Sequence, residues 1–138
     1  MRIMALDLGT KRIGVAMSDE LFFTAQGYDT IYRASPDEDL AKIKKLAEEN
    51  GVCEIVLGLP INMNGTHGPK VKEVMDFMDT LTKVVTVPVK TWDERLTTVQ
   101  ANNVLLEADV SRAKRKKSVD RIAAQFILQS YLDSRKKG

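Results

Sequence analysis

The sequence predicts an α/β fold, in which a five-stranded mixed sheet with its first three strands antiparallel is flanked by helices. Apolar runs of strand length recur five times, and the first three follow one another across short turns. Helical patterns separate the later strands, an order that produces parallel pairing. No repeat or low-complexity linker interrupts the 138 residues, so we expect one domain spanning 1–138.

The first three strands are expected to form a meander. Residues 1–8 and 12–18 are two short apolar segments joined by a tight turn at 9–11, Gly-Thr-Lys. Residues 22–33 supply the third strand. Neighbouring strands connected this closely pair antiparallel.

The first helix is expected between Ser35 and Asn50. Ser35 is suited to cap it, Pro36 to lie in its first turn, and Glu38 to complete a capping box. Asn50 and Gly51 then end it. Its apolar face is formed by Leu40, Ile43, Leu46 and Ala47.

The rest of the chain alternates strands and helices. Strands are expected at 53–59 and 84–91, with a helix over 69–83 between them. Further helices are expected at 97–108 and from Ser118 onward, separated by a basic loop. The apolar positions of the last helix are Val119, Ile122, Ala123, Phe126, Ile127 and Tyr131.

Positive charge is concentrated near the end of the chain. Residues 1–110 hold 12 Lys and Arg against 17 Asp and Glu, whereas residues 111–138 hold 9 against 2. The run SRAKRKKS at 111–118 accounts for much of this excess. Such a run either contacts a polyanion or is a solvated loop. If it contacts nucleic acid, the contacting residues are Arg112, Lys114, Arg115, Lys116 and Lys117.

Composition also indicates the cellular compartment of the protein. No apolar run approaches the ~20 residues that span a bilayer, and the N-terminus has no signal-peptide pattern. The single cysteine, Cys53, cannot form an internal disulfide, which suits a reducing compartment. We therefore expect a cytoplasmic protein.

Three carboxylates are candidates for one site. Asp7 lies inside an apolar strand, where an isolated charge is costly. Asp93 and Glu94 follow the fifth strand, and Asp120 lies in the first turn of the last helix. Ligands of open α/β sheets gather at the carboxyl ends of parallel strands, so Asp7, one of Asp93 and Glu94, and Asp120 could converge there if the last helix packs on the sheet.

Converging carboxylates repel one another unless a cation lies between them. Hard oxygen ligands favour Mg²⁺ or Mn²⁺, and two such ions ~4 Å apart can hydrolyse a phosphodiester. Asp7 could instead pair with Lys11 or Arg12, and Glu94 and Asp120 have ordinary explanations as a surface ion pair and a helix N-terminal charge. For Asp7, inside an apolar strand, metal binding explains more.

Four motifs follow one another along the chain: DLGTKRIGVA (7–16), GLPINMNGT (58–66), WDERLTT (92–98) and VDRIAAQFILQSYL (119–132). Together they resemble the YqgF/RuvX family, which is related to the RuvC Holliday junction resolvase. The resemblance implies a ribonuclease H-like fold and a metal-dependent nuclease. It implies processing of the 5′ end of pre-16S rRNA or, alternatively, resolution of Holliday junctions.

The resemblance also implies roles for individual residues. Asp7, Glu94 and Asp120 match the three catalytic acids, which would bind Mg²⁺ or Mn²⁺, with two ions expected. RuvC-like enzymes usually carry the second acid after the fourth strand, where this chain has Gly-Leu-Pro at 58–60. Glu94 would therefore substitute from the next strand, with Asp93 as a stand-in.

Lys11 and Arg12 follow Asp7 closely and are expected to hold the scissile phosphate or the flanking strand. The only histidine, His67, lies in the glycine-rich loop after the fourth strand. It is either a proton carrier or an incidental surface residue.

Two other classes of protein fit part of the sequence. Actin- and Hsp70-like ATP-binding proteins share the D-x-G-T hairpin, but they need two lobes, and 138 residues supply one. A non-catalytic module that grips ribosomal RNA through the basic loop is the third class. The sequence leaves open RNA or branched DNA as substrate, a small-subunit precursor as partner, and the oligomeric state, although a resolvase would need a dimer.

Overall fold

The computed structural model describes residues 1–62, 64–93 and 112–136, and within the last range it describes side chains from 121 to 135. The elements in chain order are β1 (Arg2–Leu8), β2 (Arg12–Ser18), β3 (Ala25–Tyr32), α1 (Pro36–Glu49), β4 (Val52–Leu59), α2 (Pro69–Val84), β5 (Val89–Asp93) and α4 (Arg112–Lys136).

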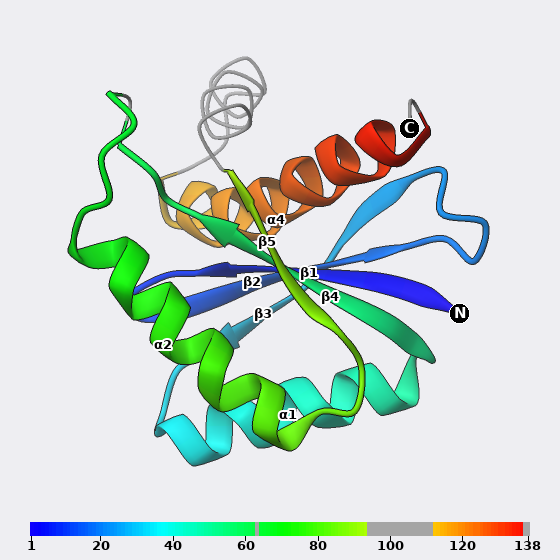
Figure 1. The fold of residues 1–138 in the computed structure, drawn as a ribbon, viewed down its shortest axis with the longest axis horizontal. Helices are drawn as coiled ribbons and strands as arrows, with labels where there is room; N and C mark the ends of the chain where they lie inside the picture. Colours follow the sequence, from blue (N-terminus) through cyan, green and yellow to red (C-terminus); the bar gives the residue numbers. More distant parts are fainter. Residues whose placement is uncertain (63, 94–111, 137–138) are drawn as a thin grey trace.

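The strands form one five-stranded sheet in the order β3-β2-β1-β4-β5. Strands β1, β2 and β3 pair antiparallel, whereas β4 pairs parallel with both β1 and β5. Helices α1 and α2 cover one face of the sheet and α4 crosses the other (Figure 1). The predicted mixed sheet, with helices on both faces, is confirmed.

Each face of the sheet has its own apolar core. Because side chains alternate along a strand, β1 directs Met4 and Leu6 toward α1 and α2, and Ile3 and Ala5 toward α4. The parallel strands end at the side of the sheet where α4 begins (Figure 1). This side is called the carboxyl edge below.

The ends of α1 form as predicted. Ser35 Oγ accepts a hydrogen bond from the Glu38 backbone N–H at 3.2 Å, and Pro36 opens the helix. The helix ends at Asn50, and Gly51 follows with a φ of 62°, a conformation that suits glycine.

The fifth strand begins later than predicted. Val84 belongs to α2, and the Val85 backbone N–H donates to the Leu81 carbonyl at 3.1 Å, which closes the helix end. Strand β5 starts only at Val89, so Asp93 is its last residue instead of following it. The helix predicted at 97–108 lies outside the described residues.

The basic loop predicted before the last helix is wrong. Helix α4 begins at Arg112, so residues 112–117 are helical and Ser118 is not its N-cap. Lys, Arg and Ala have high helix propensity, and no Gly or Pro lies between 112 and 136. The helix that packs on the sheet therefore continues back through the basic run.

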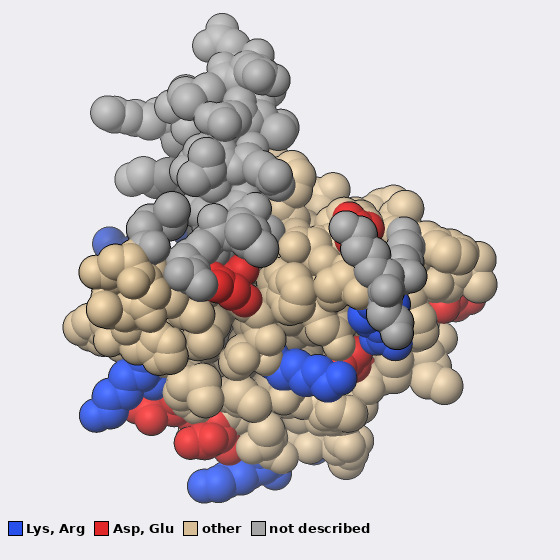
Figure 2. Space-filling view, turned by 45° about the horizontal axis from the view of Figure 1, so that its top comes forward, with Lys and Arg blue, Asp and Glu red and all other residues tan. Residues whose placement is uncertain are grey.

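On the described surface that faces the viewer in Figure 2, acidic and basic side chains are interspersed. Among the helices the structure describes, none combines the length and the hydropathy required to cross a membrane.

Candidate functional site

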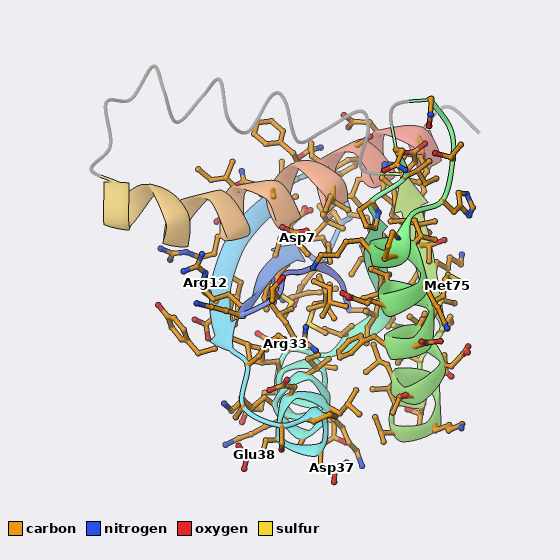
Figure 3. All side chains as sticks on the ribbon, turned by 90° about the vertical axis from the view of Figure 1, so that its left-hand side faces the viewer. Asp7, Arg12, Arg33, Asp37, Glu38 and Met75 are labelled. Carbon is orange, nitrogen blue, oxygen red and sulfur yellow. The ribbon has the colours of Figure 1, made fainter. Side chains whose placement is uncertain are left out.

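Asp7 lies on the α4 face of the sheet near the carboxyl edge. It follows Ile3 and Ala5 by the two-residue repeat of the strand, and both of those pack in the core under α4. Figure 3, which looks onto the carboxyl edge, shows Asp7 just beneath α4. The side chain is half-buried.

Glycines occupy the strand positions on both sides of Asp7. The antiparallel register pairs Asp7 with Gly14 of β2. The parallel register with β4 pairs Leu6 with Leu57, so Gly58 comes next beside Asp7. Both glycines are buried and neither has a Cβ, so the two strand positions directly opposite Asp7 carry no side chain.

The row through Asp7 continues to both edges of the sheet. Gly14 pairs with Thr30 of β3, and Gly58 pairs with Trp92 of β5. Thr30 Oγ1 is buried and makes no hydrogen bond among the described groups. The Trp92 indole N–H donates to Ser130 Oγ of α4 at 3.1 Å, so this ring packs under the helix.

The turn after β1 is held tightly. The Gly9 N–H donates to the Arg12 carbonyl at 2.8 Å, and a Cβ at Gly9 would lie 2.6 Å from that oxygen. Glycine is therefore required there for the close approach of two backbone segments. The Arg33 N–H also donates to the Lys11 carbonyl at 2.9 Å.

The Arg33 side chain ties this turn to the start of α1. Its Nη1 donates to the Gly9 carbonyl at 2.8 Å and its Nε lies 3.4 Å from Asp39 Oδ2. Asp39 is 2% exposed and also accepts the Ala34 N–H at 3.0 Å. The buried Asp39 carboxylate thus holds the Arg33 side chain, and Arg33 in turn holds the turn that follows Asp7.

The two cations predicted beside Asp7 lie at the carboxyl edge. Lys11 is exposed in the turn, and Arg12 is the half-buried first residue of β2. Arg12 pairs across the sheet with Tyr32, the last residue of β3. Figure 3 shows Arg12 and Asp7 at the same edge.

The structure describes the three predicted acids to different extents. Glu94 lies outside the described residues, and for Asp120 the structure describes the α4 backbone alone. Asp93 is described, and it pairs with Leu59, whose side chain packs toward α1 and α2. The strand repeat therefore places Asp93 on the face opposite Asp7, which argues against its role as a stand-in.

Within the described residues no group of three or more His, Cys, Asp or Glu side chains could hold a metal ion. Asp7 contributes a carboxylate, a hard oxygen ligand, from a mainly apolar strand with a glycine on either side. This environment fits Mg²⁺ or Mn²⁺, which prefer oxygen ligands. The convergence of Asp7, Glu94 and Asp120 stays a prediction.

The glycine-rich loop after β4 forms hydrogen bonds within itself. The Asn62 side chain donates to Thr66 Oγ1 at 3.0 Å, and Asn64 Oδ1 accepts the Thr66 N–H at 3.0 Å. Gly65 has a φ of 87°. His67 is exposed beyond this turn. Ordinary turn chemistry accounts for the described residues of the loop.

A second carboxylate, Glu54 of β4, lies on the same face and was missed by the sequence analysis. It is 7% exposed and pairs with Lys90 Nζ at 2.8 Å and Arg135 Nη1 at 2.9 Å. The Tyr131 hydroxyl donates to Glu54 Oε1 at 2.8 Å. Because Tyr131 and Arg135 belong to α4, this cluster ties the helix to the amino end of β4.

The pKa of Glu54 shows the balance within this cluster. Burial works to raise it, but the hydrogen bonds from Lys90 and Tyr131 and the charges of Lys90 and Arg135 outweigh burial and lower the pKa. The pKa of Lys90 is raised by its hydrogen bond to Glu54. Burial and the contact with Glu54 raise the pKa of Tyr131. Glu54 is thus held as a carboxylate.

Comparison with known proteins extends over almost the whole chain. The family described as "RuvX: Holliday junction resolvase" matches residues 1–134. A protein of Halothermothrix orenii named "Putative pre-16S rRNA nuclease" is 54% identical over 137 residues, covering 99% of this chain and 98% of the relative. A protein of Clostridium kluyveri with the same name is 55% identical over 133 residues, covering 96% and 97%.

Two solved structures share the fold. RuvC of T. thermophilus in complex with a Holliday junction substrate has a TM-score of 0.58 at 14% identity, covering 99% of this chain and 96% of that one. The fowlpox virus resolvase with Holliday junction DNA has a TM-score of 0.58 at 15% identity, covering 98% and 99%. At these identities the likeness concerns the fold, and it confirms the predicted ribonuclease H-like architecture.

Proposed function

The chain belongs to the RuvX family, and from this premise we propose that it is a metal-dependent nuclease acting on the 5′ end of pre-16S rRNA. As a member of a nuclease family it is a hydrolase of phosphodiester bonds. The relatives that are 54–55% identical carry the name of a pre-16S rRNA nuclease, which supports this substrate. A cytoplasmic location and the small-subunit precursor as partner belong to the same proposal.

The position of Asp7 is the observation that carries the proposal. Its carboxylate stands at the carboxyl edge of a rigid sheet, between Gly14 and Gly58, on the face covered by α4. Asp7 places a carboxylate inside a mainly apolar strand, with no side chain at the two directly opposite strand positions. Asp120 belongs to the helix that covers the same face.

Asp7, Glu94 and Asp120 would hold one or two Mg²⁺ or Mn²⁺ ions. When bound, such ions supply the positive charge that lowers the pKa of an attacking water and stabilises a departing oxygen. The chain itself contributes a carboxylate held rigidly on β1. Lys11 and Arg12, at the same edge, would bind phosphates and orient the strand.

The start of α4 is the second part of the proposed nucleic-acid interface. Because residues 112–117 are helical, we propose that the cations of this run contact phosphates from a helix that overhangs the site. Figure 3 shows this end of α4 extending past the sheet on the side of Arg12. The residues proposed to contact phosphate are Arg112, Lys114, Arg115, Lys116 and Lys117.

Neutralising these five cations tests that interface. Replacing them with glutamine, which keeps helix propensity, should weaken nucleic-acid binding and reduce the slope of log affinity against log salt by up to ~4–5 for duplex substrates. Binding titrations at several salt concentrations measure the slope. An unchanged affinity and slope would show that the run is only solvated.

Resolution of Holliday junctions is the second candidate function, favoured by the description of the family itself. The test offers both substrates to the purified full chain with Mg²⁺ or Mn²⁺: an RNA carrying the pre-16S 5′ leader and a four-way DNA junction. Cleavage of the RNA alone supports rRNA processing. Symmetrical cleavage of the junction by a dimer supports resolution, and cleavage of neither contradicts both.

A further inference from the structure

Tyr32 is an exposed aromatic residue at the carboxyl edge. It ends β3, an edge strand of the sheet, and 51% of its surface is exposed. It pairs with Arg12, and the strand repeat puts both on the face that Asp7 shares. Ile31, the preceding residue, is buried in the core on the other face. An aromatic ring is thus held at the rim of the candidate site.

A groove begins at this ring. It has a volume of about 660 Å³ and runs between the β1–β2 turn, the β3–α1 connection and α2. Its lining includes Thr10, Lys11, Tyr32 and Arg33, together with the carboxylates Asp39 and Glu73. The volume lies in the roughly 300–1,000 Å³ range of small-ligand sites, so it suits single nucleotides and is too small for a duplex.

The charges around the groove favour phosphate at one end. Lys11 is exposed at the end nearest Asp7. The cations Arg33 and Lys70 are engaged by Asp39 at 3.4 Å and by Glu73 at 3.5 Å.

Beyond the groove lining, the start of α1 carries further acidic side chains. Asp37 and Glu38 lie in the first turn of that helix. Figure 3 shows them away from Asp7, with Arg33 between. A polyanion is therefore attracted at the turn and repelled beyond it, which limits the contact to a few nucleotides.

We propose that an unpaired nucleic-acid strand leaves the Asp7 edge across Tyr32, with one base stacked on the Tyr32 ring and a phosphate at Lys11. Within a duplex both faces of a base are covered by its neighbours, so a protein ring stacks on a base that is unpaired. This inference rests on the proposed nuclease function. It adds that the substrate is single-stranded on one side of the cut.

The test compares two tyrosines of one strand. Tyr28 also lies on β3 and is 45% exposed, but it sits toward the other end, where its hydroxyl contacts Asn50 at 3.5 Å. The probes are a blunt duplex and the same duplex with an unpaired tail, made once as RNA and once as DNA. Binding is measured with the full chain in EDTA, so cleavage plays no part.

Tyr32→Ala should weaken binding of a tailed duplex by about 5–100-fold and leave the blunt duplex unchanged. Tyr32→Phe and Tyr28→Ala should bind both probes like the wild type. A 2-aminopurine in the tail should change its fluorescence on binding to wild type and not to Tyr32→Ala.

Equal binding of both RNA and DNA tails by Tyr32→Ala and wild type would overturn this inference alone. An equal loss on blunt and tailed probes would overturn it too, because the ring would then contact paired nucleic acid or shape the fold. If wild type binds neither probe, the proposed function itself fails.

Discussion

Asp7 and Glu54 are two carboxylates with similar sequence neighbours and different neighbours in space. Each interrupts an apolar strand, and each lies on the face of the sheet that α4 covers. Asp7 lies near the carboxyl end of β1, whereas Glu54 lies near the amino end of β4. The two acids therefore stand at opposite ends of one helix-covered face.

Their neighbours differ in kind. Glu54 is compensated by Lys90, Arg135 and the Tyr131 hydroxyl, all within 2.9 Å. Asp7 stands between two glycines. A buried strand acid is thus no sign of function by itself. The residues that adjacent elements place around each acid must be known before a role is assigned to it.

The largest expected effect is on catalysis at Asp7. Asp7→Asn keeps the shape and removes the charge, so cleavage should fall by more than the ~10–100-fold that loss of an outer-shell partner of a metal ligand costs. The free energy of unfolding without metal should stay the same or rise, because crowded carboxylates repel. Cleavage assays and urea unfolding measure the two effects, and full activity in this variant would end the proposed role.

The matched change at Glu54 should produce the opposite result. Glu54→Gln removes the charge that Lys90 and Arg135 face and weakens the acceptor of the buried Tyr131 hydroxyl. The free energy of unfolding should drop by about 1–3 kcal/mol, since about half of each cationic side chain is exposed and can be solvated. Urea unfolding gives the loss. Turnover should survive at temperatures where the variant is folded, and abolished cleavage in a folded variant would contradict the comparison.

The stability difference between wild type and Glu54→Gln should depend on pH. The folded pKa of Glu54 lies below its usual value of 4.5, so its stabilising contribution is complete above that value. The contribution is lost as the pH falls through the folded pKa. Unfolding titrations of both proteins between pH 7 and 3 should therefore give curves that converge only below about pH 4.5. Convergence at higher pH would mean that Glu54 is not held as a carboxylate.

The smallest expected effect is on nucleic-acid binding, and it should differ between Lys11, near Asp7, and Lys90, near Glu54. Lys11→Ala should weaken nucleic-acid binding modestly and reduce the salt slope by ~0.9 for a duplex, as one lost phosphate contact does. Lys90→Ala removes an equal charge beside Glu54 and should leave the slope unchanged. Titrations across salt concentration compare them, and equal slopes in the two variants would remove Lys11 from the interface.

Local pattern predicted most of the fold. Alternating and helical periodicities over short windows located β1, β2, β4 and both ends of α1, because strand and helix signals and caps depend on residues a few positions apart. The position of Asp7 inside an apolar run followed from the same local reading. The errors fell at the start of β5, where α2 includes Val84 and a connection follows it up to Val89, and at the start of α4, where the helix itself extends back through the basic run.

The sequence by itself indicated that Asp7 interrupts an apolar strand, and the tertiary structure decided what surrounds Asp7 and placed Glu54 of β4 on the same face. Glu54 meets Tyr131 and Arg135, which lie 77 and 81 residues away in the chain. Asp7 meets Gly14 and Gly58 through strand register. Register and helix placement are fixed by burial of apolar surface over the whole sheet, so no short window of sequence contains them.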